Sequence, residues 1–76
     1  MIGKTIKYMR NKKGIKQGEL AKILNVERTT LSGYETERRK VDFETVQKIA
    51  KVCNYQLFFE GNNEKFKCED VERKDI

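Results

Sequence analysis

The first residues of the chain alternate between apolar and polar positions with the period of an α-helix. Ile2, Ile6 and Met9 are four and three residues apart, which places them on one face, while lysines occupy the other faces. Gly14 follows the last of these turns, and glycine is the residue that most easily ends a helix. The pattern therefore predicts a first helix over residues 2–12.

The next apolar positions predict two short helices that cross at a tight turn. Leu20, Ala21 and Leu24 fall on one face of a helix over residues 17–24, and Ala21 is small enough for another helix to approach closely. Asn25 follows this helix and enters the left-handed conformation at little cost. A short helix, an abrupt stop and a second helix together are typical of a helix-turn-helix unit.

The second helix of this unit is expected over residues 28–35. Leu31 and Tyr34 are three residues apart and would face the core. The other side of the helix would then face outward, where it can enter the major groove of DNA. We expect the outward positions to be Arg28, Thr29, Ser32 and Gly33.

A fourth helix and a change of pattern follow. Asp42 is a good N-cap, and Asn54 suits the end of the helix. Its apolar face would comprise Phe43, Val46, Ile49, Ala50 and Cys53. After Tyr55 the pattern becomes strand-like, with QLFFE, a turn and EKFKC, which predicts a hairpin within residues 56–69. We expect a frayed, charged tail over residues 70–76.

Length and charge limit the possible functions. The chain has 76 residues and a formal net charge of +5, which is enough for one domain with a small core. Residues 1–51 hold thirteen Lys/Arg against six Asp/Glu, whereas residues 52–76 hold four against six. The positive charge thus accompanies the helix-turn-helix, which favours a nucleic-acid partner. So small a core also makes a homodimer the default expectation.

Catalytic and metal chemistry find little support in the composition. The chain has no histidine, and its two cysteines, Cys53 and Cys68, do not form a CxxC pair. We expect reduced thiols, no metal, no cofactor and no enzyme, because no pairing of a base with a nucleophile is evident. The segment MIGKTIKYMR contains no long apolar run, so we expect a cytoplasmic protein without a membrane span.

Three motifs carry a resemblance to a known family. They are QGELAKILNV at the first helix of the unit, LSGYE in the second, and VQKIAKVCNY at the end of the fourth helix. In this order, and with a basic loop between the last two, the chain resembles the Cro/CI-like (XRE) helix-turn-helix regulators over residues 2 to about 55. The resemblance implies a mainly α fold, a lambda-repressor-like bundle of four helices, here with a C-terminal β-strand or hairpin.

The resemblance also implies roles for individual residues. Arg10 and Glu35 would form a structural ion pair, and Gln17 would contact phosphate and orient recognition side chains. Gly33 departs from the family pattern, since most relatives carry a long polar side chain there, so we expect a base contact to be missing. The family's base-contacting positions fall on Arg28, Thr29, Ser32 and Gly33, and the implied phosphate contacts are Lys16, Gln17, Thr30, Thr36, Arg38, Arg39 and Lys40.

The family's phage repressors have a fifth helix where this chain has the predicted hairpin, and the hairpin admits two interpretations. It either covers the core within one chain or pairs with a second chain. Candidate dimer-interface residues are Leu57, Phe58, Phe59 and Phe66. The function expected from the resemblance is a repressor that binds double-stranded DNA at a palindromic operator as a dimer. The alternative is an antitoxin that binds its own operator and also a toxin protein.

Overall fold

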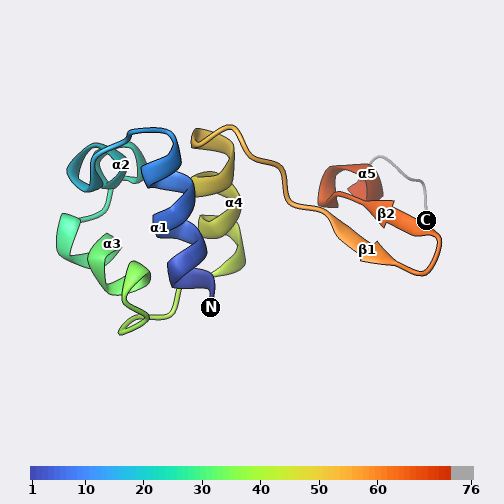
Figure 1. Cartoon of the computed structure of the whole chain (residues 1–76), viewed down its shortest axis with the longest axis horizontal. Coiled ribbons are helices and arrows are strands. Elements are labelled where there is room, and N and C mark those ends of the chain that lie inside the picture. The colour runs from blue at the N-terminus through green and yellow to red at the C-terminus, as the bar shows by residue number, and fades with distance from the viewer. Residues whose placement is uncertain (73–76) are drawn as a thin grey trace.

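The computed structural model describes residues 1–72 and consists of a four-helix bundle with a small C-terminal lobe beside it (Figure 1). The lobe contains a two-stranded antiparallel hairpin and a final short helix. In chain order the elements are α1 (Ile2–Lys12), α2 (Gln17–Leu24), α3 (Arg28–Glu35), α4 (Phe43–Val52), β1 (Phe59–Gly61), β2 (Glu64–Phe66) and α5 (Cys68–Glu72). The mainly α fold expected from the sequence is confirmed.

Local signals set the ends of the bundle helices. Gly14, Asn25 and Asn54 have positive φ angles of 69°, 58° and 63°, and each lies just beyond the end of a helix. At the start of α4 the carboxylate of Asp42 accepts a hydrogen bond of 2.9 Å from the amide of Thr45. The predicted bounds of α1, α2 and α3 are confirmed because these stop and start signals are short-range.

The core lies where the four bundle helices meet. α1 and α2 both contact α3 and α4, so α2 and α3 are held as one unit against the other two helices. Ile15, Leu24, Val26 and Tyr34 pack around the core from its edge. The buried residues of the core are Ile6, Met9, Leu20, Ala21, Leu31, Ile49, Ala50 and Cys53.

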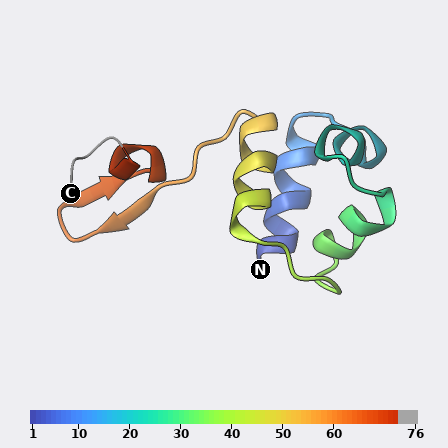
Figure 2. The ribbon, with the colours of Figure 1, turned by 180° about the vertical axis from the view of Figure 1, so that it is seen from behind.

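The hairpin extends beyond α4, on the side away from α3, and both views show this arrangement (Figures 1 and 2). Its strands pair within the chain, with Phe59 opposite Phe66. Phe43 was expected to face the core but is 46% exposed, and its ring lies 6.1 Å from that of Phe59. That expectation is wrong because Phe43, at the first turn of α4, is directed to the hairpin, while Leu57 packs against the core.

The end of the described chain differs from the expected tail. Cys68–Glu72 forms α5, so the prediction of fraying from Asp70 is wrong for residues 70–72. The carboxylate of Asp70 accepts a hydrogen bond of 2.9 Å from the amide of Lys67, which satisfies one donor at the start of this turn. Residues 73–76 of the expected tail lie outside the described part of the chain.

Candidate nucleic-acid interface

The outer face of α3 carries the polar side chains that the sequence places there. Leu31 is fully buried and fixes the inner face, which leaves Arg28 and Thr29 exposed and Ser32 partly exposed. Arg28 and Thr29 occupy the first turn of α3, directly after the turn that joins it to α2. A helix that presents its N-terminal side chains in this way is suited to reading base edges in the major groove.

A buried ion pair connects α1 to the end of α3. Arg10 Nε donates to Glu35 Oε2 at 2.6 Å, and Arg10 Nη2 donates to Glu35 Oε1 at 3.0 Å. Arg10 Nη1 also donates to the carbonyl of Ile15 at 2.9 Å. The fork geometry satisfies both carboxylate oxygens, and the hydrogen bond to Glu35 holds the pKa of Arg10 above its usual value. The pair therefore fixes the position of α3 relative to α1.

Gln17 extends this polar network to the outer face of α3. Its Nε2 donates to Glu35 Oε1 at 3.2 Å, and its Oε1 accepts from Arg28 Nη1 at 3.1 Å. Gln17 is the first residue of α2, so the network joins three helices. It links the buried pair to the first exposed side chain of α3 through one amide group.

Gly33 does not lie on the exposed face of α3. It is buried, and a Cβ atom added there would lie 2.8 Å from Cγ and 2.9 Å from Cδ of Arg39. The carbonyl of Gly33 also accepts hydrogen bonds from the amides of Arg38 and Arg39. The expectation that Gly33 faces outward is wrong, because the loop after α3 folds back and lays the Arg39 stem across this position.

Gly33→Ala is expected to weaken DNA binding through Arg39. The added methyl group would displace the stem of Arg39, whose guanidinium is a proposed phosphate contact. The salt dependence of binding should then fall by about one unit of slope, as for Arg39→Ala. Fluorescence anisotropy across a salt series measures this slope. If the Gly33→Ala/Arg39→Ala double variant has the same salt slope as either single variant, both changes act through the phosphate contact of Arg39. Losses of slope that add would contradict this.

A basic loop lies beside this face, at the end of α3. Arg38, Arg39 and Lys40 are all exposed. Glu37, in the same loop, has a φ of 64°, and its carboxylate accepts a hydrogen bond from the amide of Gly3 at 3.1 Å. The α-amino group of Met1, followed by that amide, holds the pKa of Glu37 below its ordinary value. Glu37 thus fastens the loop to α1.

The remaining residues of the expected phosphate-binding set have different environments. Lys16 is exposed and precedes α2, where Glu19 accepts a hydrogen bond of 2.9 Å from its amide. Thr30 is only partly exposed. The hydroxyl of Thr36 donates to the carbonyl of Ser32 at 2.9 Å, so donation to a phosphate requires it to release that bond. The three residues are therefore not equivalent: Lys16 is exposed, Thr30 is partly buried and the hydroxyl of Thr36 already donates within the chain.

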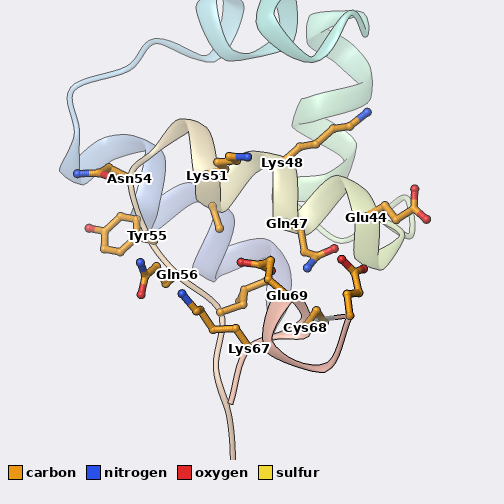
Figure 3. Close-up of a pocket in the computed structure, with 13 residues that line it drawn as sticks. Glu44, Gln47, Lys48, Lys51, Asn54, Tyr55, Gln56, Lys67, Cys68 and Glu69 are labelled. Carbon is orange, nitrogen blue, oxygen red and sulfur yellow. The ribbon is translucent and has the colours of Figure 1, made fainter. Parts of the chain in front are cut away.

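A second surface feature lies away from α3. A groove of about 580 Å³ runs between the outer side of α4 and the C-terminal lobe (Figure 3). Gln47 and Lys51 of α4 line one side, and Lys67 and Glu69 line the other. Its lining carries charges of both signs and shares no residue with the expected DNA-contacting set. The groove therefore belongs to the junction between the bundle and the hairpin.

Burial of the thiol supports a packing role for Cys53. The residue is 1% exposed, and burial raises the pKa of its thiol. A neutral buried thiol behaves as a small apolar side chain. Cys68 is only partly buried, and neither cysteine forms a disulfide within the described residues.

Comparison with known proteins identifies the family. A family model described as Helix-turn-helix matches residues 6–59, which include α2, α3 and the loop after them. The chain belongs to the Cro/CI-like (XRE) helix-turn-helix family. It is 38% identical over 53 residues to the HTH-type transcriptional regulator ImmR of Bacillus subtilis (strain 168). This alignment covers 70% of the chain and 42% of the relative.

These comparisons support a role in DNA-binding transcription regulation, and the family is one of regulators and not a class of enzymes. The aligned region spans less than half the length of the relative. Over residues 1–72, no helix has both the length and the apolar character needed to cross a membrane. The family assignment therefore concerns the helix-turn-helix region.

Proposed function

We propose that the chain is a sequence-specific double-stranded DNA-binding transcriptional regulator that acts as a repressor. The observation that carries this proposal is the placement of Arg28 at the exposed start of α3, oriented by Gln17. A guanidinium in this position can donate two hydrogen bonds to O6 and N7 of guanine. Thr29 and Ser32 would contact neighbouring base edges.

The flanking basic residues would provide affinity without base selection. Lys16 and the loop residues Arg38, Arg39 and Lys40 are exposed around α3, and Gln17 lies at the positive end of the α2 dipole. Contacts of this kind release counterions and make binding depend on salt. Gly33 would contribute by making room for Arg39 and not by contacting a base.

We further propose that the chain binds a palindromic operator as a homodimer. Two copies would place their α3 helices about 34 Å apart, in successive major grooves. Phe58 and Phe59 are 46% and 43% exposed in the single chain, on opposite faces of the hairpin. Pairing the hairpin with that of a second copy would remove apolar surface and an exposed strand edge from water.

The hairpin residues divide between two environments. The rings of Phe59 and Phe66 stack with their centroids 5.7 Å apart. Phe58 lies on the other face, where the ammonium of Lys65 is 4.6 Å from its ring centroid. Leu57 packs on the core, so it is the least available of the expected interface residues. We therefore assign the dimer contact to the three phenylalanines of the hairpin.

Phe58→Ser is expected to weaken the dimer, because it removes exposed apolar surface without disturbing the Phe59–Phe66 stack. Light scattering at tens of micromolar should report a dimer for the unmodified chain and a larger monomer fraction for the variant. Asn62→Ser, at the exposed turn of the same hairpin, is the matched control. A monomer for the unmodified chain would contradict the homodimer.

In vitro selection from random duplexes tests the proposed function. The expected product is a palindrome with two half-sites about one helical turn apart. A pool without any enriched sequence would contradict specific recognition.

The antitoxin alternative rests on the same exposed hairpin, and purification of the tagged chain from its native host distinguishes it. A second protein that is retained with the tagged chain in equimolar amount would favour the antitoxin.

A further inference from the structure

The amide of Gln17 has only one orientation that satisfies both of its neighbours. Glu35 Oε1 is a carboxylate oxygen that accepts, and it receives Gln17 Nε2 at 3.2 Å. Arg28 Nη1 can only donate, and it meets Gln17 Oε1 at 3.1 Å. A flipped amide would set its oxygen against the carboxylate and its NH2 group against the guanidinium. The charges on the two sides therefore define which end of the amide faces Arg28.

Glu35, which orients the amide of Gln17, is buried and rigid, whereas Arg28, which the amide contacts, is exposed. The side chain of Glu35 is 3% exposed and is held by two hydrogen bonds from Arg10. Arg28 is exposed and emerges from the first turn of α3. An unsupported arginine at such a position samples many rotamers, and ordering it on binding costs free energy. Gln17 lowers that cost, because the buried pair of Arg10 and Glu35 holds its amide in place before Arg28 binds to DNA.

We propose that Glu35 is a positioning residue for base recognition: through the amide of Gln17 it holds Arg28 in the rotamer that reads guanine. The buried pair then has two separate roles, since it ties α1 to α3 and also sets the direction of the recognition arginine. This inference rests on the proposed function and deepens it. The hydrogen bond to Gln17 uses one of the five N–H donors of Arg28, so four remain, and two of these can bond O6 and N7 of guanine.

The test uses the full chain and the double variant Arg10→Met/Glu35→Leu. The two substitutions remove both charges together while keeping similar volumes, so no buried charge is left without a partner. Binding is measured to four duplexes that differ only at the base pair contacted by Arg28. The preference for guanine should fall about two- to tenfold, which corresponds to ordering one flexible side chain. Affinity for unrelated DNA should stay within about twofold, because the phosphate contacts remain.

A double-mutant cycle separates positioning from a general loss of stability. Gln17→Met removes the linking amide from a partly exposed site. If Glu35 acts through Gln17, the Arg10→Met/Glu35→Leu change should reduce the guanine preference no further in a Gln17→Met background. Val46→Ala, which creates a cavity in α4 away from the network, is the matched destabilised control. It should retain the full preference.

A structural readout in the free protein completes the test and remains informative if the double variant does not fold. The side-chain amide hydrogens of Gln17, followed by NMR, should exchange slowly with water because they donate to Glu35. The guanidinium hydrogens of Arg28 should be protected through Gln17 Oε1. In Arg28→Ala the amide hydrogens of Gln17 should still show protection through Glu35. Three results would each overturn the positioning role. They are amide hydrogens of Gln17 that are unprotected in the unmodified chain, a double variant whose guanine preference is undiminished, and losses of guanine preference that add in the cycle. An unmodified chain without any base preference would overturn the proposed function together with it.

Discussion

Arg10→Met is expected to lower the free energy of unfolding by about 3 to 5 kcal/mol, because it leaves the carboxylate of Glu35 buried without its ion-pair partner. The side chains of Arg10 and Glu35 are 10% and 3% exposed, so water cannot replace the lost guanidinium. Gln17 alone would remain as a donor to that carboxylate. A domain of this size has only a modest total stability, so the single change should remove much of it.

The double variant Arg10→Met/Glu35→Leu provides the control for this effect. Replacing both charges with apolar groups removes the cost of burying them, so its stability should lie within roughly 1 to 2 kcal/mol of that of the unmodified chain. Urea unfolding followed by circular dichroism measures the free energies of both variants. If the free energy of unfolding fell by the same amount in the single and double variants, the cost would come from packing. The explanation by an unpaired buried charge would then be wrong.

Gly3→Ala is expected to lower the free energy of unfolding by about 1 to 3 kcal/mol, the usual cost of forcing an extra group into a packed site. A Cβ atom at Gly3 would lie 2.5 Å from the carbonyl oxygen of Tyr34 and 2.7 Å from that of Glu35. Backbone carbonyls at a helix end cannot rotate away as a flexible side chain can. α1 would therefore have to move away from the C-terminal end of α3.

Gly18→Ala is the matched comparison for this prediction. Gly18 lies in the first turn of α2, as Gly3 does in α1, but an added Cβ atom would meet only Cδ of Arg28, at 3.9 Å. It should leave the stability unchanged or raise it by up to about 1 kcal/mol, because alanine favours the helix over glycine. Thermal unfolding of the two variants in parallel separates close packing from helix propensity. Equal midpoints would contradict the close approach of α1 to α3.

The bundle was predictable from sequence because its signals are local. Asn25 stops α2 by adopting a left-handed conformation, and Asp42 caps α4 through the amide of Thr45. Each of these residues acts within four positions of itself. The spacing of Leu20, Ala21 and Leu31 then specifies which faces meet, and all three are buried. Local signals that agree with the apolar pattern give the correct helix bounds.

The wrong predictions concern residues whose surroundings are set by parts of the chain outside their own helix. Gly33 lies at an outward position of an isolated α3, but Arg39 folds across it from the following loop. Phe43 fits an apolar helix face, but it packs toward Phe59 of the hairpin instead of the core. Gly3 carried no signal at all, because its importance comes from the position of the carbonyl groups at the end of α3. Side-chain paths and interhelix distances of this kind are tertiary properties.

The candidate site was predictable in part. The family resemblance implied the Arg10 and Glu35 pair, which is present with hydrogen bonds of 2.6 and 3.0 Å. The periodicity of α3 placed Arg28 and Thr29 on its exposed face, where they lie. The contact from Glu35 to Gln17 had no counterpart in the sequence pattern, since it depends on side-chain directions from two helices. The DNA contacts themselves remain predictions.

The most direct test of base reading by Arg28 is the affinity for four operators that differ only at the contacted base pair. The chain should prefer guanine roughly 5- to 150-fold, the ratio that corresponds to one well-formed bidentate contact. Arg28→Ala should bind all four operators with nearly equal affinity and retain its salt dependence through the phosphate contacts. Equal affinity of the unmodified chain for all four operators, or an undiminished preference in Arg28→Ala, would contradict the assignment of Arg28 as the base-reading residue.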